Sequence, residues 1–151
     1  MLINYTTKEL DLTARIMRAE ALAEGDLGML MVGNVIVNRA IANCLEFKNV
    51  RTLTDVIYQK NQFVGTKSSL FNSKATTKEK DLAKRVIKGE YYHPATHALY
   101  FYAPSKGSNC KSTWFNQNFA GKYKNHCFYE PEEGVCKELH WKRCNLLIEL
   151  Y

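Results

Sequence analysis

The stretch LTARIMRAEALAEGDLGMLMVGNVIVNRA, residues 12–40, predicts two helices joined by a tight turn at Gly25. Glu20 follows Ile16 by four residues, so at helical spacing its carboxyl group shares a face with apolar side chains. A carboxylate on an apolar face is costly unless it is paired or keeps its proton. Two interpretations follow: Glu20 is satisfied by an arginine or by backbone amides, or it is a carboxylic acid that donates a proton near neutral pH.

Helix-start signals extend this pattern along the chain. Capping sequences of the types T-x-x-E and T-x-x-D predict helices over residues 7–23, 53–59 and 77–88. Asp26 is expected to cap a further helix over residues 27–42. Helices therefore make up most of the predicted fold.

Two short strands complete the expected secondary structure. HALYFYA at residues 97–103 is rich in aromatic residues and ends before Pro104, and HCFY at residues 126–129 is a second candidate. Alternate residues of a strand point to opposite faces, so Tyr100 and Tyr102 share one face. One face is expected in the core and the other in a cleft. The pattern as a whole predicts an α+β fold, mainly helical, with a small β element.

The remaining segments are predicted to be loops and one terminal helix. Residues 60–73 are polar and irregular with interleaved aromatic residues, which is typical of loops that carry binding residues. In this segment Gln62 offers an amide and Phe63 a flat face suited to an N-acetylated sugar, although Phe63 can equally plug the core. Residues 105–118 are predicted to form a loop, and residues 134–151 a terminal helix.

Composition and charge limit the function classes. With 151 residues, 46% of them hydrophobic and 24% charged, the chain is predicted to be one folded domain over residues 1–151. Its 21 Lys and Arg against 15 Asp and Glu give a net charge of +6, which favours a polyanionic partner, either nucleic acid or an anionic wall polymer. No nucleic-acid motif, membrane-spanning stretch or secretory signal is visible, so we expect neither a nucleic-acid partner nor a membrane span.

The cysteines and histidines show no metal-binding pattern. Cysteines at positions 44, 110, 127, 136 and 144 are odd in number, so at least one is unpaired within a monomer. No C-x-x-C occurs, and the spacing of the last three cysteines with His126 and His140 fits no standard zinc finger. No phosphate-binding glycine loop is present either. We therefore expect no metal and no cofactor, and we expect buried thiols or late cross-linking for the cysteines.

Several separated motifs resemble one known family. The motif E-A-x-x-E-G at residues 20–25, followed by a helix that ends V-I-V-N-R at residues 35–39, resembles the opening of the spore cortex-lytic cell wall hydrolase family (SleB/CwlJ type). The resemblance continues in the same order with V-I-Y-Q at 56–59, Q-F at 62–63, A-L-Y-F-Y at 98–102 and H-C-F-Y at 126–129. It covers about residues 10–130, and N-C-x-S-x-W-F-N at 109–116 is most similar to the compact CwlJ-like branch. Residues 131–151 lie outside it as a C-terminal extension.

The resemblance implies a lysozyme-like fold, similar to lytic transglycosylases, that cleaves peptidoglycan between N-acetylmuramic acid and N-acetylglucosamine. In such enzymes one glutamate at the end of a helix acts first as acid and then as base, and Glu20 matches it by position. The 6-hydroxyl of the sugar itself attacks, which leaves a 1,6-anhydro-muramic end and needs neither water nor a second carboxylate. The implied substrate is spore cortex, which carries muramic δ-lactam and is cleaved during germination.

Supporting roles are expected for several other residues. Glu24 is either a second catalytic carboxylate or a structural acid that pairs with a cation or caps the second helix. Asn38 orients the acid or holds a sugar if it faces the acid. Tyr100 and Tyr102 are candidates to present phenols to the cleft, where Tyr100 hydrogen-bonds the acid or packs under the sugar ring. His126 is a candidate hydrogen-bond donor behind the site.

Other functions fit part of the pattern. A hydrolytic muramidase or glucosaminidase would use Glu20 with water as the acceptor. A non-catalytic spore-coat protein would use the cysteines, tyrosines and basic surface for cross-linking and wall binding. We expect the protein at the boundary of spore coat and cortex, placed there without a secretory signal and with the help of a coat partner protein, or else released by lysis.

Overall fold

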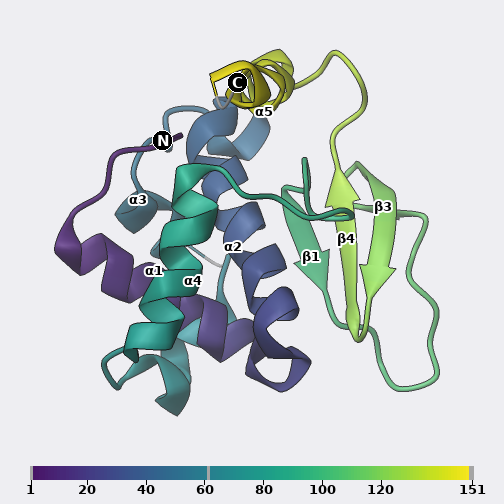
Figure 1. Ribbon diagram of the computed structural model, residues 1–151. Helices are drawn as coiled ribbons and strands as arrows, with labels where there is room; N and C mark the ends of the chain where they lie inside the picture. The colour runs from purple at the N-terminus through teal and green to yellow at the C-terminus, as the bar shows by residue number, and fades with distance from the viewer. Residues whose placement is uncertain (1, 61, 150–151) are drawn as a thin grey trace.

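The computed structural model describes residues 2–60 and 62–149 and shows an α+β fold in which helices predominate (Figure 1). The helices are α1 (Thr7–Ala21), α2 (Gly25–Ala42), α3 (Leu53–Ile57), α4 (Thr77–Lys88) and α5 (Lys137–Glu149). The strands are β1 (Tyr100–Tyr102), β2 (Thr113–Trp114), β3 (Gln117–Tyr123) and β4 (His126–Glu130). The predicted fold class is therefore confirmed. The helix predicted over residues 77–88 has the predicted ends, and the ends of the others differ by a few residues. Residues 150–151 of the predicted terminal helix lie outside the described residues.

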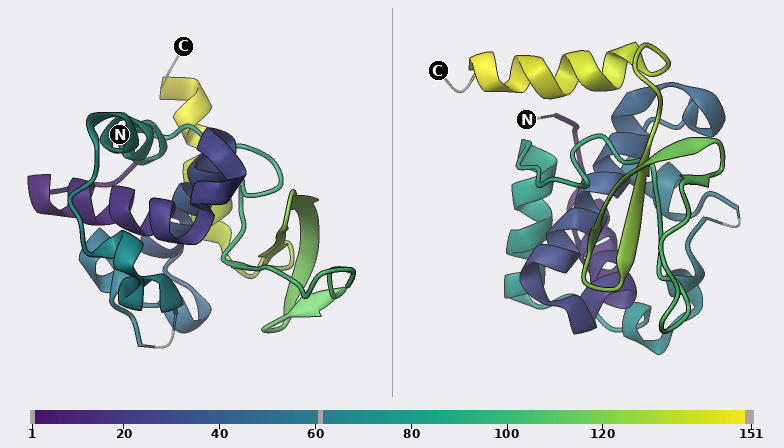
Figure 2. Two further views of the ribbon diagram at one scale, coloured as in Figure 1. Left: turned by 90° about the horizontal axis from the view of Figure 1, so that it is seen from below. Right: turned by 90° about the vertical axis from the view of Figure 1, so that its right-hand side faces the viewer.

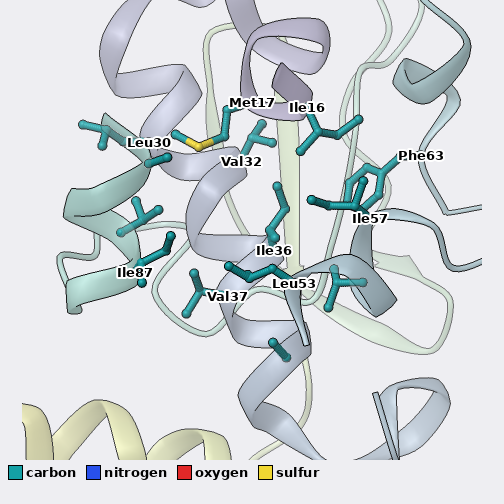
Figure 3. Close-up of a cluster of buried hydrophobic side chains, with 14 of the residues drawn as sticks. Ile16, Met17, Leu30, Val32, Ile36, Val37, Leu53, Ile57, Phe63 and Ile87 are labelled. Atoms are coloured by element: carbon teal, nitrogen blue, oxygen red, sulfur yellow. The ribbon is translucent and has the colours of Figure 1, made fainter. Parts of the chain in front are cut away.

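Helix α2 is the centre of the arrangement. It packs against α1 and α4 on one side, the sheet lies beside it, and α5 runs across one end of the molecule (Figure 2). Figure 3 shows Val32 and Ile36 of α2 meeting Ile16 and Met17 of α1. All residues of α2 from position 28 to position 42 are buried, so the helix is enclosed on every side.

The junction between α1 and α2 differs from the prediction. Helix α1 starts at the predicted capping box of Thr6 and Glu9, and a 3-10 turn, η1 (Leu22–Glu24), follows its end. Gly25 then takes a φ of +77°, a left-handed conformation that costs glycine little. Because α2 begins at Gly25, Asp26 lies inside the first turn and does not cap the helix as predicted.

The sheet is antiparallel, with the strand order β1-β4-β3-β2. The sequence predicts β1 and β4, although β1 is shorter than the predicted strand over residues 97–103. Residues 105–118, expected as a loop, contain β2 and the start of β3. Strand β3 gives little sequence signal because most of its side chains are exposed or half-buried, so no apolar alternation marks it.

Two disulfide bonds tie later segments to the core. Cys44, just after α2, is bonded to Cys136, just before α5, and Cys110 is bonded to Cys127 of β4. The expectation of buried thiols is wrong for these four cysteines, since each lies beside a partner distant in sequence. Cys144 is exposed and unpaired within the described residues, as the odd count requires.

Asn38 lies in the core and not in a cleft. Its Nδ2 donates to the backbone oxygens of Ala95, Thr96 and Ala98 at 3.1, 3.2 and 2.9 Å. Its Oδ1 accepts from Nε and Nη2 of Arg143, at 3.0 and 2.7 Å. The predicted contact of Asn38 with Glu20 or a sugar is therefore wrong: the amide is fully used to hold the segment before β1 and helix α5 on α2.

Replacing Asn38 with alanine should lower the free energy of unfolding by about 2–4 kcal/mol, because buried carbonyls and the Arg143 guanidinium would lose their partners. Urea denaturation measures this change, with Asn72→Ala as an exposed control. A loss for Asn38→Ala no larger than that of the control would contradict the structural role.

Candidate active site

A cavity of about 640 Å³ lies between the α1–α2 junction, the segment after α3 and the sheet. Its walls come from segments far apart in the sequence. The polar and aromatic side chains that line it include Glu20, Glu24, Arg39, Gln62, Phe101, Tyr102 and His126. The cavity therefore brings together five of the predicted site residues, namely Glu20, Glu24, Gln62, Tyr102 and His126, and it adds two that the sequence did not indicate.

Glu20 lies in the last turn of α1 and is half-buried. Its Oε1 accepts a hydrogen bond from the backbone N–H of Gly65, at 3.0 Å. Burial raises the pKa of the carboxyl group, and the Gly65 N–H and the charge of Arg39 offset part of that rise. Both interpretations of Glu20 thus hold in part, because the carboxyl has a backbone partner and also keeps its proton to higher pH than an ordinary glutamic acid.

Arg39 of α2 is a charged residue of the site that the sequence did not single out. Its Nε donates to the backbone oxygen of Leu99 at 2.7 Å, and only 2% of its surface is exposed. The guanidinium lies over the rings of Phe47, Phe63 and Tyr100, at 4.8, 4.8 and 5.1 Å from their centroids. Burial lowers the pKa of Arg39 to about 10, so the side chain remains a cation at neutral pH. The available sequence signal is that Arg39 is the one charged residue between positions 27 and 42 of a mainly apolar helix.

Glu24 and His126 form a buried pair across the cavity wall. The Nδ1 of His126 hydrogen-bonds Oε1 of Glu24, and the backbone N–H of Asn125 donates to Oε2 at 2.8 Å. Glu24 therefore does not cap α2 with its side chain; the turn between β3 and β4 satisfies it instead. Burial lowers the pKa of His126, so the ring is neutral at pH 7 and its Nδ1–H donates to the Glu24 carboxylate. His126 is thus a donor, as predicted, but to Glu24.

The aromatic residues of β1 divide differently from the prediction. Tyr100 is buried, its hydroxyl donates to the Glu46 carboxylate, and its ring stacks on Phe115 with centroids 4.7 Å apart. Its predicted place in the cleft is wrong. Phe101 lines the cavity and packs edge-on against His126 at 5.2 Å, while Tyr102 lines the cavity near the end of the short strand.

The segment after α3 supplies one residue to the cavity and one to the core. Gln62 lines the cavity wall, where its amide is available to a ligand. Phe63 is 7% exposed and lies among the core side chains (Figure 3). The guanidinium of Arg39 lies over its ring. Of the two predicted roles for Phe63, the structure favours the core plug.

Two further observations concern metals and membranes. Within residues 2–60 and 62–149, no cluster of three or more His, Cys, Asp or Glu side chains has the geometry to hold a metal ion. Across the same described residues, none of the helices has the length and apolar character that crossing a membrane requires.

Two solved structures have the same fold. The catalytic domain of the germination-specific lytic transglycosylase SleB from Bacillus anthracis superposes with a TM-score of 0.66 at 21% identity, covering 84% of this chain and 98% of that domain. The catalytic domain of SleB from Bacillus cereus gives a TM-score of 0.65 at 22% identity, covering 86% and 97%. The chain therefore has the fold of these two domains, an α+β fold in which helices predominate, as predicted.

Sequence relatives define the family. Residues 23–129 match the Cell Wall Hydrolase family. The cell wall hydrolase CwlJ of Oceanobacillus iheyensis is 46% identical over 138 residues, and that of Bacillus subtilis is 41% identical over 138 residues; each alignment covers 91% of this chain and 96% of the relative. The chain belongs to the Cell Wall Hydrolase family and is a peptidoglycan-cleaving enzyme. The family match begins after Glu20 and so does not include this residue.

Replacing Gly65 with alanine should slow cleavage on the order of 100-fold. A Cβ at this position would lie 2.6 Å from Oε1 of Glu20, and the φ of Gly65 is not left-handed, so the displaced carboxyl causes the loss. Losing the Gly65 N–H bond also removes an interaction that lowers the pKa of Glu20, so the alkaline fall in activity should move to higher pH.

Rate profiles against pH for wild type, Gly65→Ala and Gly107→Ala test this prediction. Gly107 is a fair control because a Cβ there meets nothing within 4 Å, although its left-handed φ adds some backbone strain. A Gly65→Ala profile that matches the wild type in rate and in pH would contradict the role assigned to this glycine.

Replacing Glu20 with glutamine should stabilise the protein at about pH 8 but not at about pH 4. Because burial raises the pKa of Glu20 above its ordinary 4.5, the folded state binds this proton more tightly than the unfolded state. The wild type therefore loses stability relative to the variant as pH rises above 4.5 and through the folded-state pKa. Urea unfolding at both pH values measures the difference, with exposed Glu133→Gln as a control. The same difference at both pH values would argue against a raised pKa.

Proposed function

We propose that the protein is a lytic transglycosylase that cleaves glycan strands between N-acetylmuramic acid and N-acetylglucosamine, with Glu20 as its single acid and base. Glu20 protonates the oxygen between the two sugars as the bond from this oxygen to C1 of the muramic residue breaks. The 6-hydroxyl of the muramic residue then attacks C1, and its proton returns to the Glu20 carboxylate. No water is consumed, and the enzyme ends in its starting protonation state.

The observation that carries this proposal is the half-buried, protonatable Glu20 in the wall of the 640 Å³ cavity. An acid catalyst needs a proton to give at neutral pH, which burial favours here. It must also stabilise the carboxylate left behind, and the Gly65 N–H and Arg39 do so. One side chain is thereby suited to both steps.

The state of Glu24 supports a single-carboxylate route over the hydrolytic alternative. Both of its carboxylate oxygens already accept hydrogen bonds, from His126 and from the backbone N–H of Asn125. These bonds stabilise the carboxylate and hold it against the β3–β4 turn, which makes it a weaker nucleophile or general base toward a reacting carbon or a water molecule. Glu24 acts in this proposal as a support that holds His126 and the β3–β4 turn against α2.

The proposed substrate, location and partner go beyond the names of the relatives. The relatives are named cell wall hydrolases, and the structural neighbour is titled a germination-specific enzyme. We extend this to spore cortex with muramic δ-lactam as the substrate, and to the coat–cortex boundary as the location. A coat partner protein is proposed to place the enzyme there, with residues 1–151 acting as one catalytic unit.

Glu20→Gln should reduce cleavage at least about 100-fold, whereas Glu24→Gln should stay within about tenfold of the wild type. A glutamine at position 24 keeps the shape of the side chain: its oxygen can accept from the Asn125 N–H, and its NH2 can donate to Nδ1 of His126 once the neutral ring takes its other tautomer. It is therefore a matched control for loss of one carboxylate. Mass spectrometry of fragments released from decoated cortex and from vegetative wall measures both rate and product.

The products separate the alternatives. Anhydro-muramic ends that are absent with Glu20→Gln support the lytic transglycosylase. Reducing ends, with both variants inactive, would replace it by a two-carboxylate hydrolase. Wall binding by folded wild-type protein without any cleavage would favour the coat-protein alternative.

A further inference from the structure

The guanidinium of Arg39 is a buried cation at the cavity without an anionic partner. Its Nη1 is buried and has no hydrogen-bond partner among the described residues, and Arg39 takes part in no ion pair within that part of the chain. The charges of Glu20 and Glu46 act on Arg39, but neither carboxyl group bonds to it: Glu20 accepts from the Gly65 N–H, and Glu46 accepts from the Tyr100 hydroxyl.

The other two buried arginines show that this is not the ordinary state of an arginine in this fold. Arg18 donates to three backbone carbonyls and forms an ion pair with Glu79 at 2.9 Å. Arg143 donates to Asn38 through two nitrogens and to the backbone oxygen of Gly89 through the third. Leaving a buried charged donor unpaired costs several kcal/mol in general, so such a group commonly serves a ligand.

The contacts of Arg39 preorganise its side chain for ligand binding. Three aromatic rings stabilise its charge, but a ring does not accept an N–H bond as an oxygen does. The bond from Nε to Leu99 fixes the side chain at the cavity. What is missing is an oxygen acceptor with substantial negative charge, since guanidinium groups pair best with carboxylates and strongly polar carbonyls.

We propose that Arg39 binds the lactyl-derived oxygen of the muramic residue in the cavity. This inference rests on the proposed function, in that it takes the ligand to be a peptidoglycan strand. Of the two alternating sugars, only the muramic residue carries a lactyl group, whose oxygen is a carboxylate when free and a carbonyl when closed into the δ-lactam. Both sugars carry an acetamido group when the lactyl group is free, and a neutral donor such as Gln62 is sufficient for an acetamido group.

The first test measures binding with the non-cleaving Glu20→Gln protein, alone and combined with Arg39→Lys or Arg39→Met. Three tetrasaccharides serve as probes: one from cortex with δ-lactam, one from vegetative glycan with its peptides removed, and chitotetraose, which has acetamido groups but no lactyl group. Both Arg39 variants should lose about 10-fold to 100-fold in affinity for lactyl-bearing probes and little for chitotetraose. An equal loss for all three probes would overturn the proposal in favour of a structural role.

The two lactyl-bearing probes distinguish the sources of the oxygen. A larger loss with the vegetative fragment identifies the carboxylate as the group that Arg39 binds, and a larger loss with the cortex fragment identifies the lactam carbonyl. Either result supports the proposal. No loss with either fragment, in variants that unfold normally in urea, refutes it.

A second measurement keeps Arg39 and so does not depend on how Arg39→Lys and Arg39→Met fold. Arginine side-chain NMR signals of ¹⁵N-labelled Glu20→Gln protein are followed as each probe is added. The Arg39 signals should shift, and its N–H exchange should slow, only with lactyl-bearing probes, while Arg18 and Arg143 serve as internal references. Unchanged Arg39 signals at saturation would refute the proposal.

Failure of the proposed function remains distinguishable from failure of this inference. If the wild type releases no fragments but the binding and NMR results hold, the Arg39 assignment stands and the cleavage mechanism falls. If the wild type cleaves and Arg39→Lys changes only the pH profile, with unaltered binding, Arg39 acts through Glu20 and the assignment falls.

Discussion

The full burial of α2 is the constraint on which the rest of the structure depends. A helix enclosed on every side must satisfy its polar side chains internally, and α2 carries Asn34, Asn38 and Arg39. Asn34 bonds backbone groups at Glu90 and Tyr92, and Asn38 bonds the segment before β1 together with α5. The hydrogen bonds that these buried side chains of α2 require thus position the segment that leads to the sheet, the terminal helix α5 and the guanidinium of Arg39 at the cavity.

The candidate site balances two opposing effects on one carboxyl group. Burial favours the protonated form of Glu20, while the Gly65 N–H and Arg39 favour the ionised form. Neither effect eliminates the other, which suits a group that must lose a proton and regain it in each cycle. The Glu24–His126 pair adds no acid to this balance, but it closes the cavity wall by joining the start of α2 to β4.

Local order was predictable from the sequence, and long-range pairing was not. Capping boxes and apolar spacing depend on residues a few positions apart. The sequence therefore predicts the first residue of each of the helices that follow Thr6 and Thr76. The partners that define the site lie far along the chain, 45 positions away for Glu20 and 102 for Glu24. Spacing singled out Glu20, but an arginine such as Arg39 becomes unusual only once its burial and missing partner are known.

The two disulfides make the protein's stability depend on its chemical surroundings. The Cys44–Cys136 bond spans 92 positions, and closing a loop of that length removes much of the disorder available to the unfolded chain, on the order of 4–5 kcal/mol. In a reducing environment neither disulfide bond forms, and the chain relies on side-chain hydrogen bonds to keep α5 in place. The oxidised chain therefore resists unfolding more than the reduced chain, and the contacts of α5 are the ones most exposed to that difference.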